Sequence, residues 1–179
     1  MAFMKKHPFL QVDYHSTVKL SANDKKQLAK WLNYASEALE YLFQEGILPK
    51  AKFKAVNTVQ VSLMICGDAR IRELNREHRN KDKVTDVLSF PAHEDLRKAS
   101  YKMPELFLGD LAICHQQTKR QAKEFKISYW DEFIHLMIHG MIHLIGYDHE
   151  VSRAEEKLME KWEKIGLDKI SEIKKKGAR

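Results

Sequence analysis

Three histidines near the end of the chain constrain its fold more than any other feature. They belong to the segment HGMIHLIGYDH, which begins at His139, continues through His143 and ends at His149. Two histidines four residues apart lie on one face of an α-helix, about one turn from each other. Gly146 follows three residues later, where a helix can end in the left-handed conformation that glycine adopts without strain. The pattern therefore predicts a helix, a sharp turn and a return of the chain toward the same helix face.

The same spacing predicts a metal site. Imidazole nitrogens bind zinc at about 2.0–2.1 Å, and three protein ligands leave one tetrahedral position for water, as in catalytic zinc sites. A single histidine on an apolar helix face is usually a packed core residue, but three of them around a helix-ending glycine are typical of a metal site. We therefore expect His139, His143 and His149 to hold one zinc ion in a metal-dependent hydrolase.

Two neighbouring residues qualify this prediction. His135 lies one turn before His139 on the same predicted helix face. It is roughly 12 Å from His143 along the helix axis, so both cannot bind one ion. We expect His135 on the substrate side or behind the ligands. Gly140 stands where the metzincin protease signature HExxHxxGxxH has its glutamate base, which argues against peptide hydrolysis by that route. Glycine within a helix costs about 1 kcal/mol relative to alanine. We therefore expect either that close packing excludes a side chain at Gly140 or that the missing side chain leaves room for a bulky phosphodiester.

Apolar periodicity along the rest of the chain predicts an α/β (α+β) fold. We expect a small mixed sheet of about four strands packed against several helices, with the metal-binding helix beside the sheet. Gly109, in the middle of the last predicted strand, indicates a bulge or a close approach of two backbones. Strands are predicted over residues 9–14, 58–66, 84–90 and 106–114, and helices over residues 24–46, 69–78, 116–125, 130–145 and 152–165.

The bulk composition is that of one globular domain spanning residues 1–179, in which residues 170–179 are expected to form a flexible basic tail. Lysine and arginine number 31 against 25 acidic residues, and the net charge of +6 favours polyanions such as nucleic acid. No apolar run approaches the roughly 18 residues of a membrane helix, and the start of the chain shows no apolar leader. We therefore expect a cytoplasmic protein with no membrane partner.

The two cysteines, Cys66 and Cys114, are far apart in sequence and do not form a CxxC pair. This arrangement favours two buried free thiols in a reducing compartment. A disulfide or a shared metal site is the less favoured alternative.

Three segments, one of which is the histidine segment itself, resemble the YbeY family of bacterial endoribonucleases. HGMIHLIGYDH is similar to the family's HGxLHLxGYDH signature, with Ile142 where the family commonly has leucine. LNREHRNKDKVTDVLSFP, at residues 74–91, is similar to LNxxyRxkdkpTDVLSFP, with Val84 in place of the usual proline. LGDLAI, at residues 108–113, resembles the family's LGDI strand. The resemblance covers residues 59–166 and leaves the first fifty residues outside it.

The resemblance implies a zinc-dependent endoribonuclease of the single-strand type that acts in ribosomal RNA maturation and ribosome quality control. The partners of such an enzyme would be RNA and the ribosome, and no DNA partner is expected. The resemblance also assigns His139, His143 and His149 as zinc ligands and Arg79 to RNA cleavage. A guanidinium suits that role because it is always charged and its planar fork matches two phosphate oxygens. Without the resemblance, Arg79 would be interpreted as a solvated residue favoured by the dipole at a helix end.

Weaker candidates surround these residues. Lys81 and Lys83 are candidates for phosphate contacts, although lysines in a polar loop are usually just solvated, and His135 is a candidate for substrate binding. Asp86 and Asp110 are candidates for the hydrogen-bond acceptor that a metal-bound imidazole generally needs, and turn chemistry at strand ends explains them equally well.

The hypothesis that unites these residues is metal-assisted hydrolysis of phosphodiester bonds, with Arg79 stabilising charge on the phosphate. A metallo-hydrolase of peptides or small molecules is one alternative. Another is a ribosome-assembly or RNA-binding factor whose zinc is structural. Removal of the metal should unfold such a factor, whereas a catalytic site should leave a folded, inactive protein.

Overall fold

Alternating apolar residues and helical periodicity produce four strands and six helices in the computed structural model, which describes residues 9–177. Along the chain the elements are β1 (Leu10–Ser16), α1 (Ala22–Glu45), α2 (Lys50–Phe53), β2 (Thr58–Cys66), α3 (Asp68–Arg79), β3 (Val87–Pro91), β4 (Glu105–Cys114), α4 (His115–Phe125), α5 (Tyr129–Ile145) and α6 (Arg153–Gly177).

The strands form one mixed sheet in the order β1-β2-β4-β3. β1 pairs with β2 and β2 pairs with β4 in parallel, whereas β3 runs antiparallel along β4 and forms one edge of the sheet. The predicted alternation of β2 is confirmed, because Val59, Val61, Leu63 and Ile65 are all buried. A four-stranded mixed sheet with helices against it is the α/β fold that the sequence predicts.

Gly109 in β4 produces both features predicted for it. The register between β2 and β4 shifts between Gln60 and Val61, so β4 carries one extra residue there. Gly109 has a φ of +136°, and a Cβ atom at this position would lie 2.2 Å from the backbone oxygen of Phe90 on β3. A side chain therefore has no room where β3 and β4 meet at the bulge.

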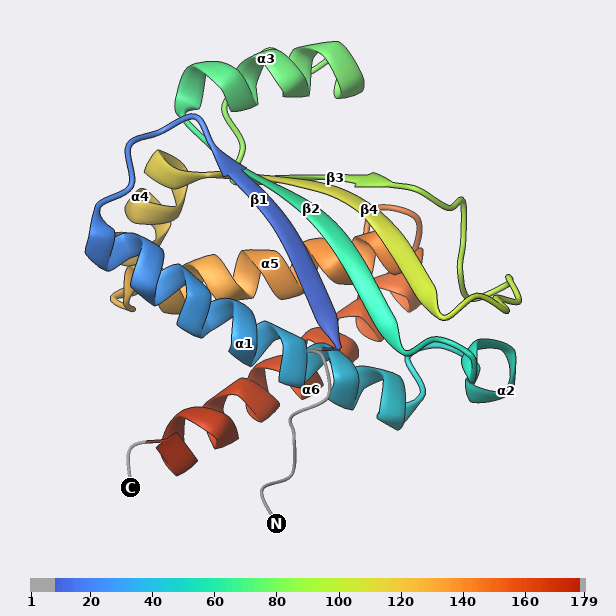
Figure 1. Ribbon diagram of the computed structural model, residues 1–179. Coiled ribbons are helices and arrows are strands. Elements are labelled where there is room, and N and C mark those ends of the chain that lie inside the picture. Colours follow the sequence, from blue (N-terminus) through green and yellow to red (C-terminus); the bar gives the residue numbers. More distant parts are fainter. Residues whose placement is uncertain (1–8, 178–179) are drawn as a thin grey trace.

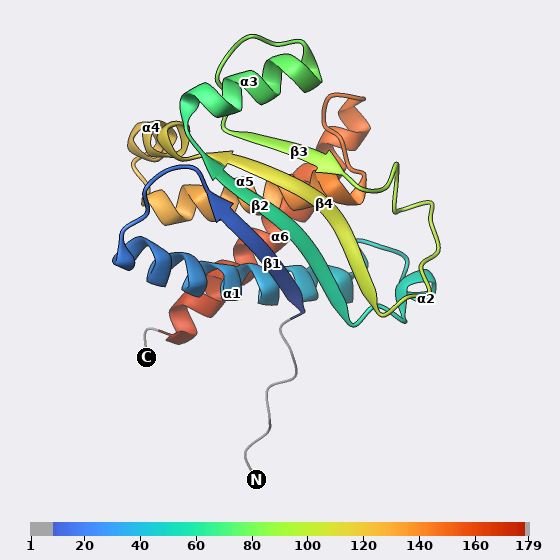
Figure 2. The ribbon, with the colours of Figure 1, turned by 45° about the horizontal axis from the view of Figure 1, so that its top comes forward.

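The helices form layers on the sheet (Figure 1). α1 and α5 cover one face, and α6 packs against α1 and α5 on the side away from the strands. α3 lies against the opposite face at one end, over a smaller apolar cluster that includes Ile71, Leu74 and Leu88 (Figures 1 and 2). The main core lies between the sheet and the α1–α5–α6 layer. α5 is thus held between the sheet and α6, which places its side chains firmly.

The C-terminal helix is longer than predicted, and most of the predicted flexible tail is helical. α6 continues from Arg153 to Gly177, well beyond residue 165. Ile170 is 3% exposed in the core, and the Lys174 ammonium pairs with Asp131 and lies 5.0 Å from the ring centroid of Trp31. These contacts to α1 and α5 hold the basic segment in place, which its composition alone does not indicate. The last two residues lie outside the described part.

β3 is shorter than predicted at its start. The strand begins at Val87 rather than at residue 84, because the Asp86 carboxylate accepts hydrogen bonds from the Val87 N–H at 2.8 Å and from the Thr85 hydroxyl at 3.2 Å. A side chain that binds its own backbone in this way competes with strand pairing.

The two cysteines lie opposite each other in the register of β2 and β4, and both are buried and free, as predicted. Burial raises the pKa of the Cys66 thiol to about 11 and that of Cys114 to about 12. Both thiols therefore stay protonated at neutral pH. None of the described helices is both long and apolar enough to cross a membrane.

Candidate metal centre

The last two turns of α5 and the turn that follows bring the three predicted ligands together. His139 and His143 project from one face of the helix, and Gly146, with a φ of +115°, ends it by donating its N–H to the His143 carbonyl at 2.9 Å. The chain then turns back and presents His149. Ligand nitrogens of the three histidines lie within 4.8 Å of one another. The spacing in the sequence thus places three imidazoles around one point.

This arrangement fits a zinc-like ion. Ring centroids are 4.7 Å apart for His139 and His143, 5.4 Å for His139 and His149, and 5.1 Å for His143 and His149. A tetrahedral ion with bonds of about 2.0–2.1 Å separates its nitrogen ligands by roughly 3.4 Å, so small ring movements suffice to close the set. His139 and His143 are partly buried and His149 is exposed, so one side of the group faces solvent.

The protonation of His143 also suits metal binding. Burial, together with repulsion from His139 and His149, lowers the pKa of His143 to about 4. The imidazole is therefore neutral at neutral pH, which is the form that donates a lone pair to a metal.

A carboxylate that the sequence did not reveal contacts the His139 ring from behind. Glu163 of α6 places Oε1 2.6 Å from Nδ1 of His139, which leaves Nε2 of that ring for a metal. Burial by itself would raise the pKa of Glu163, but the interactions with His135 and His139 outweigh it and lower the pKa to about 2. Glu163 is therefore ionised. It lies 24 residues along the chain from His139, so no local spacing pointed to it.

The two aspartates predicted to support the ligands have other surroundings. Asp86 accepts hydrogen bonds from the Val87 N–H and from Nε2 of Gln121, both at 2.8 Å. Asp110 is exposed, and the residue after it in β4, Leu111, faces α5. Because side chains alternate along a strand, Asp110 points away from the histidines.

His135 lies behind the three-histidine cluster, near two carboxylates. Its Nδ1 is 3.7 Å from Glu132, and its Nε2 is 3.9 Å from the second carboxylate oxygen of Glu163. Glu163 is the main cause of a raised pKa at His135, with a further contribution from Glu132. The sequence left two positions open for His135, on the substrate side or behind the histidines. The structure shows it behind them, near the carboxylate of Glu163.

Gly140 has the packing role that was one of its two predicted explanations. A Cβ atom at this position would lie 2.7 Å from Cδ2 of Leu111 and 3.3 Å from Oγ of Ser89. The Ser89 hydroxyl also donates a hydrogen bond to the Gly140 carbonyl at 3.3 Å. α5 therefore packs closely on β3 and β4 at this point. The idea that the missing side chain leaves room for a phosphodiester is wrong, because strand side chains occupy that space.

The three histidines open into a cleft of about 620 Å³. One wall is the end of α5 with the turn that follows it, and the other is β3 with the end of α3. The lining residues are His78, Arg79, residues 85–91, Glu94, His139, His143 and residues 146–150. Arg79, predicted to act in cleavage, lies in the second wall. Its side chain is 45% exposed, and Nη2 is 2.8 Å from Oε2 of Glu150.

The lysines of the neighbouring loop lie outside this lining. The Lys81 ammonium is 4.0 Å from the other oxygen of Glu150, so it stands close to the rim beside Arg79. Lys83 is exposed, and its carbonyl accepts a hydrogen bond from Nδ2 of Asn75, which fixes the backbone of the loop. Arg79 and Lys81 therefore share one acidic partner, and Lys83 is farther along the loop.

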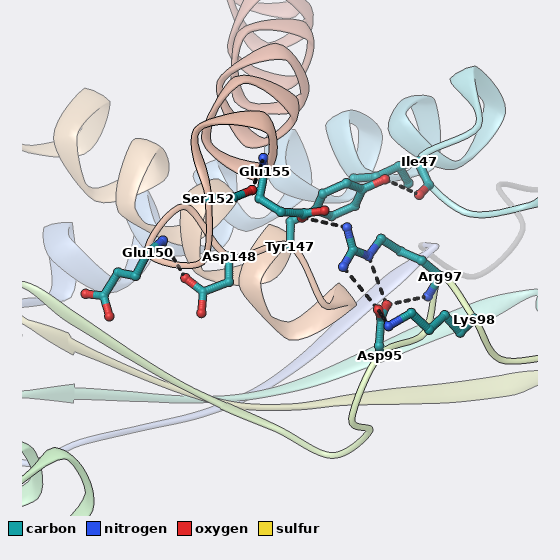
Figure 3. A network of polar contacts seen from close by, with 9 residues as sticks. All are labelled: Ile47, Asp95, Arg97, Lys98, Tyr147, Asp148, Glu150, Ser152 and Glu155. Carbon is teal, nitrogen blue, oxygen red and sulfur yellow. Dashed lines mark hydrogen bonds and ion pairs between the residues drawn. The ribbon is translucent and has the colours of Figure 1, made fainter.

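The turn that carries His149 is held by polar contacts at several points (Figure 3). The Tyr147 hydroxyl donates a hydrogen bond of 2.9 Å to the carbonyl of Ile47, one hundred residues earlier in the chain. Oδ1 of Asp148 accepts from the Glu150 N–H at 2.9 Å, which bends the backbone around His149. His149 is thus on a short turn with fixed ends rather than on a free loop.

Arg97 joins this turn to the connection between β3 and β4 (Figure 3). Its guanidinium forms two hydrogen bonds to Asp95, at 2.9 and 3.0 Å, and a third to Glu155 at 2.7 Å. It also lies 4.6 Å from the ring centroid of Tyr147. Before the start of α6 the Ser152 hydroxyl accepts a hydrogen bond from the Glu155 N–H, while the Glu155 carboxylate binds Arg97.

Comparisons with known proteins give a family and a fold. The family model of endoribonuclease YbeY matches residues 18–171. A protein named endoribonuclease YbeY from Aquifex aeolicus is 39% identical over 147 residues, which cover 82% of this chain and 84% of the relative. One of the same name from Persephonella marina is 44% identical over 104 residues, which cover 58% of this chain and 65% of that relative. A third, from Thermodesulfovibrio yellowstonii, is 38% identical over 130 residues, or 73% and 79% of the two chains.

A solved structure shares the fold. The solution structure of TM1509 from Thermotoga maritima matches with a TM-score of 0.57 and covers 93% of each chain, at 24% sequence identity. The family model spans most of this chain, including every residue of the three-histidine cluster, and the Aquifex aeolicus relative matches it over most of both lengths. The chain belongs to the endoribonuclease YbeY family.

Proposed function

We propose that this protein is a zinc-dependent endoribonuclease that cleaves single-stranded RNA in the cytoplasm during ribosomal RNA maturation and ribosome quality control. One observation carries the proposal: three imidazoles converge on one wall of a cleft whose other wall presents Arg79. The name shared by the relatives supports an endoribonuclease. A cleft of about 620 Å³ has the size of a ligand pocket, which suits one strand better than a duplex.

The chain's own residues divide the work between the two walls. His139, His143 and His149 would hold the ion, which when bound activates water and places positive charge beside the scissile phosphate. Arg79 would bind the phosphate oxygens through its planar fork and stabilise the charge that develops on them. Glu150, which now pairs with Arg79, would have to release the guanidinium to the substrate.

The packing of the molecule supports a catalytic rather than a structural metal. The main core lies between the sheet and helices α1, α5 and α6 and consists of buried apolar side chains, whereas the three imidazoles are only partly buried or exposed. We therefore expect the metal-free protein to remain folded. The packing of Gly140 against Leu111 weighs against a peptidase of the metzincin kind, because a glutamate base at this position has no room.

The test combines elemental analysis of the purified protein with a cleavage assay on structured ribosomal RNA. His143→Ala should lose both the bound zinc and cleavage, because it removes one of three ligands. Arg79→Ala should keep the zinc and lose cleavage, because its guanidinium is not a ligand. Circular dichroism of the chelator-treated wild type should show intact secondary structure; unfolding on zinc removal would favour the assembly factor with a structural zinc.

Matched controls come from the same chain. His15→Ala removes an exposed histidine on β1, and Arg76→Ala removes an exposed arginine one turn before Arg79 on α3. Both controls should keep zinc and cleavage, whereas any cleavage left in His143→Ala, prepared in the same way, reveals contaminating ribonuclease. Full cleavage by Arg79→Ala, prepared in the same way, would refute the role of the guanidinium.

A further inference from the structure

We propose that Glu163 is a positioning residue that holds the His139 ring with Nδ1 protonated and Nε2 free for the metal. The inference rests on the zinc site proposed above, and it adds a residue from α6 to a site otherwise built from α3, β3, α5 and the turn after α5. It concerns the geometry of one ligand rather than the cleavage reaction.

The contact is short and partly shielded from water. Oε1 of Glu163 lies 2.6 Å from Nδ1 of His139, and the side chains of the two residues are 18% and 24% exposed. A carboxylate accepts hydrogen bonds and donates none when it is ionised. Beside it, the neutral imidazole must carry its proton on Nδ1, so its lone pair is on Nε2.

The packing of α6 on α5 explains why Glu163 reaches His139. Gly166, three residues after Glu163 and on the same helix face, lets the two helices approach closely. A Cβ atom there would lie 3.2 Å from Cγ2 of Ile138, the neighbour of His139. Trp162 and Met159, in the turn before Glu163, are 6% and 1% exposed, so α6 is anchored next to the carboxylate. Glu163 therefore stands on a rigid support.

A second imidazole lies near the other oxygen of the carboxylate. Nε2 of His135 lies 3.9 Å from Oε2 of Glu163, within ion-pair distance. His135 and His139 are one turn apart on α5, so both face the same carboxylate. At this distance the contact is longer than a hydrogen bond, so His135 lies beside the carboxylate without fixing it.

The experiment compares Glu163→Gln with Glu160→Gln, which removes an equal charge from an exposed position on the same helix. The first readout is zinc affinity, measured by competition with a chromophoric chelator. A glutamine amide can turn its NH₂ group toward Nδ1 and favour the opposite tautomer, so Glu163→Gln should bind zinc roughly 10–100-fold more weakly. Glu160→Gln should match the wild type.

The second readout is the tautomer itself. Long-range proton–nitrogen NMR of the metal-free protein should show His139 protonated at Nδ1 in the wild type and in Glu160→Gln. In Glu163→Gln the Nε2-protonated form should appear, with thermal stability and circular dichroism unchanged. An unchanged tautomer together with unchanged zinc affinity would overturn the proposal. Neither readout involves RNA, so the proposed ribonuclease function can fail while the role of Glu163 stands.

Discussion

The hydroxyl of Tyr147 offers a sharp test of how the turn carrying His149 is held. Tyr147→Phe removes one oxygen and keeps the aromatic ring, so the contact with the Arg97 guanidinium at 4.6 Å remains. The lost interaction is the 2.9 Å hydrogen bond to the Ile47 carbonyl. Tyr147 is 7% exposed and Ile47 is 1% exposed, so water has little access to the Ile47 carbonyl once its donor is removed.

The magnitude follows from that burial. A typical hydrogen bond contributes about 0.5–1.5 kcal/mol net, and a buried acceptor left without a donor costs about 1–3 kcal/mol. We therefore expect Tyr147→Phe to lower the free energy of unfolding by about 2 kcal/mol. For a domain of this size the melting temperature should fall by about 4–8 °C.

The assay is urea unfolding of the metal-free protein, monitored by circular dichroism. Tyr41→Phe is the matched control, because Tyr41 is partly buried on α1 and its ring, rather than its hydroxyl, contacts Lys169. That variant should stay close to the wild type. If Tyr147→Phe lies within about 0.3 kcal/mol of the wild type, a resolution set by the usual scatter of such measurements, the hydrogen bond to Ile47 does not hold this turn.

Two further predictions concern the backbone and the pH. Gly109→Ala should destabilise the protein by about 3 kcal/mol or more in urea unfolding, because it adds a clash with the β3 backbone to the strain of a φ of +136°. Gly46→Ala, with a positive φ but open space around its Cβ position, should cost less. Asp95→Asn should destabilise the protein most at neutral pH. Hydrogen bonds from Arg97 lower the pKa of Asp95, so the stability that this carboxylate gives the fold is complete above about pH 4 and is lost as the pH falls through the folded-state pKa.

The outcomes that contradict these two predictions are distinct. Equal losses for Gly109→Ala and Gly46→Ala would show that strain alone matters and that the approach of β3 does not. For Asp95→Asn, the difference in unfolding free energy from the wild type is compared at about pH 7 and about pH 2.5. A difference that stays constant or grows on acidification would show that the carboxylate is not stabilised by Arg97 in the folded state.

Local patterns in the sequence determined the three-histidine cluster and most of the elements. His139 and His143 lie on one helix face because of the helical repeat alone, and Gly146 ends that helix because it adopts a positive φ freely. The alternation in β2 and the bulge at Gly109 were predictable for the same reason. Each of these features depends on residues within a few positions of one another.

Contacts between distant segments decided the rest. Glu163 reaches His139 only because α6 packs on α5, and Ile170 keeps the basic end of α6 helical by entering the core. Gly140 has its packing reason in Leu111 of β4, a strand that the spacing of the helix cannot reveal. The sequence shows which kinds of side chain recur along an element, but the partner of each side chain depends on how the elements pack. That packing is set by the burial of the whole core and not by any one segment.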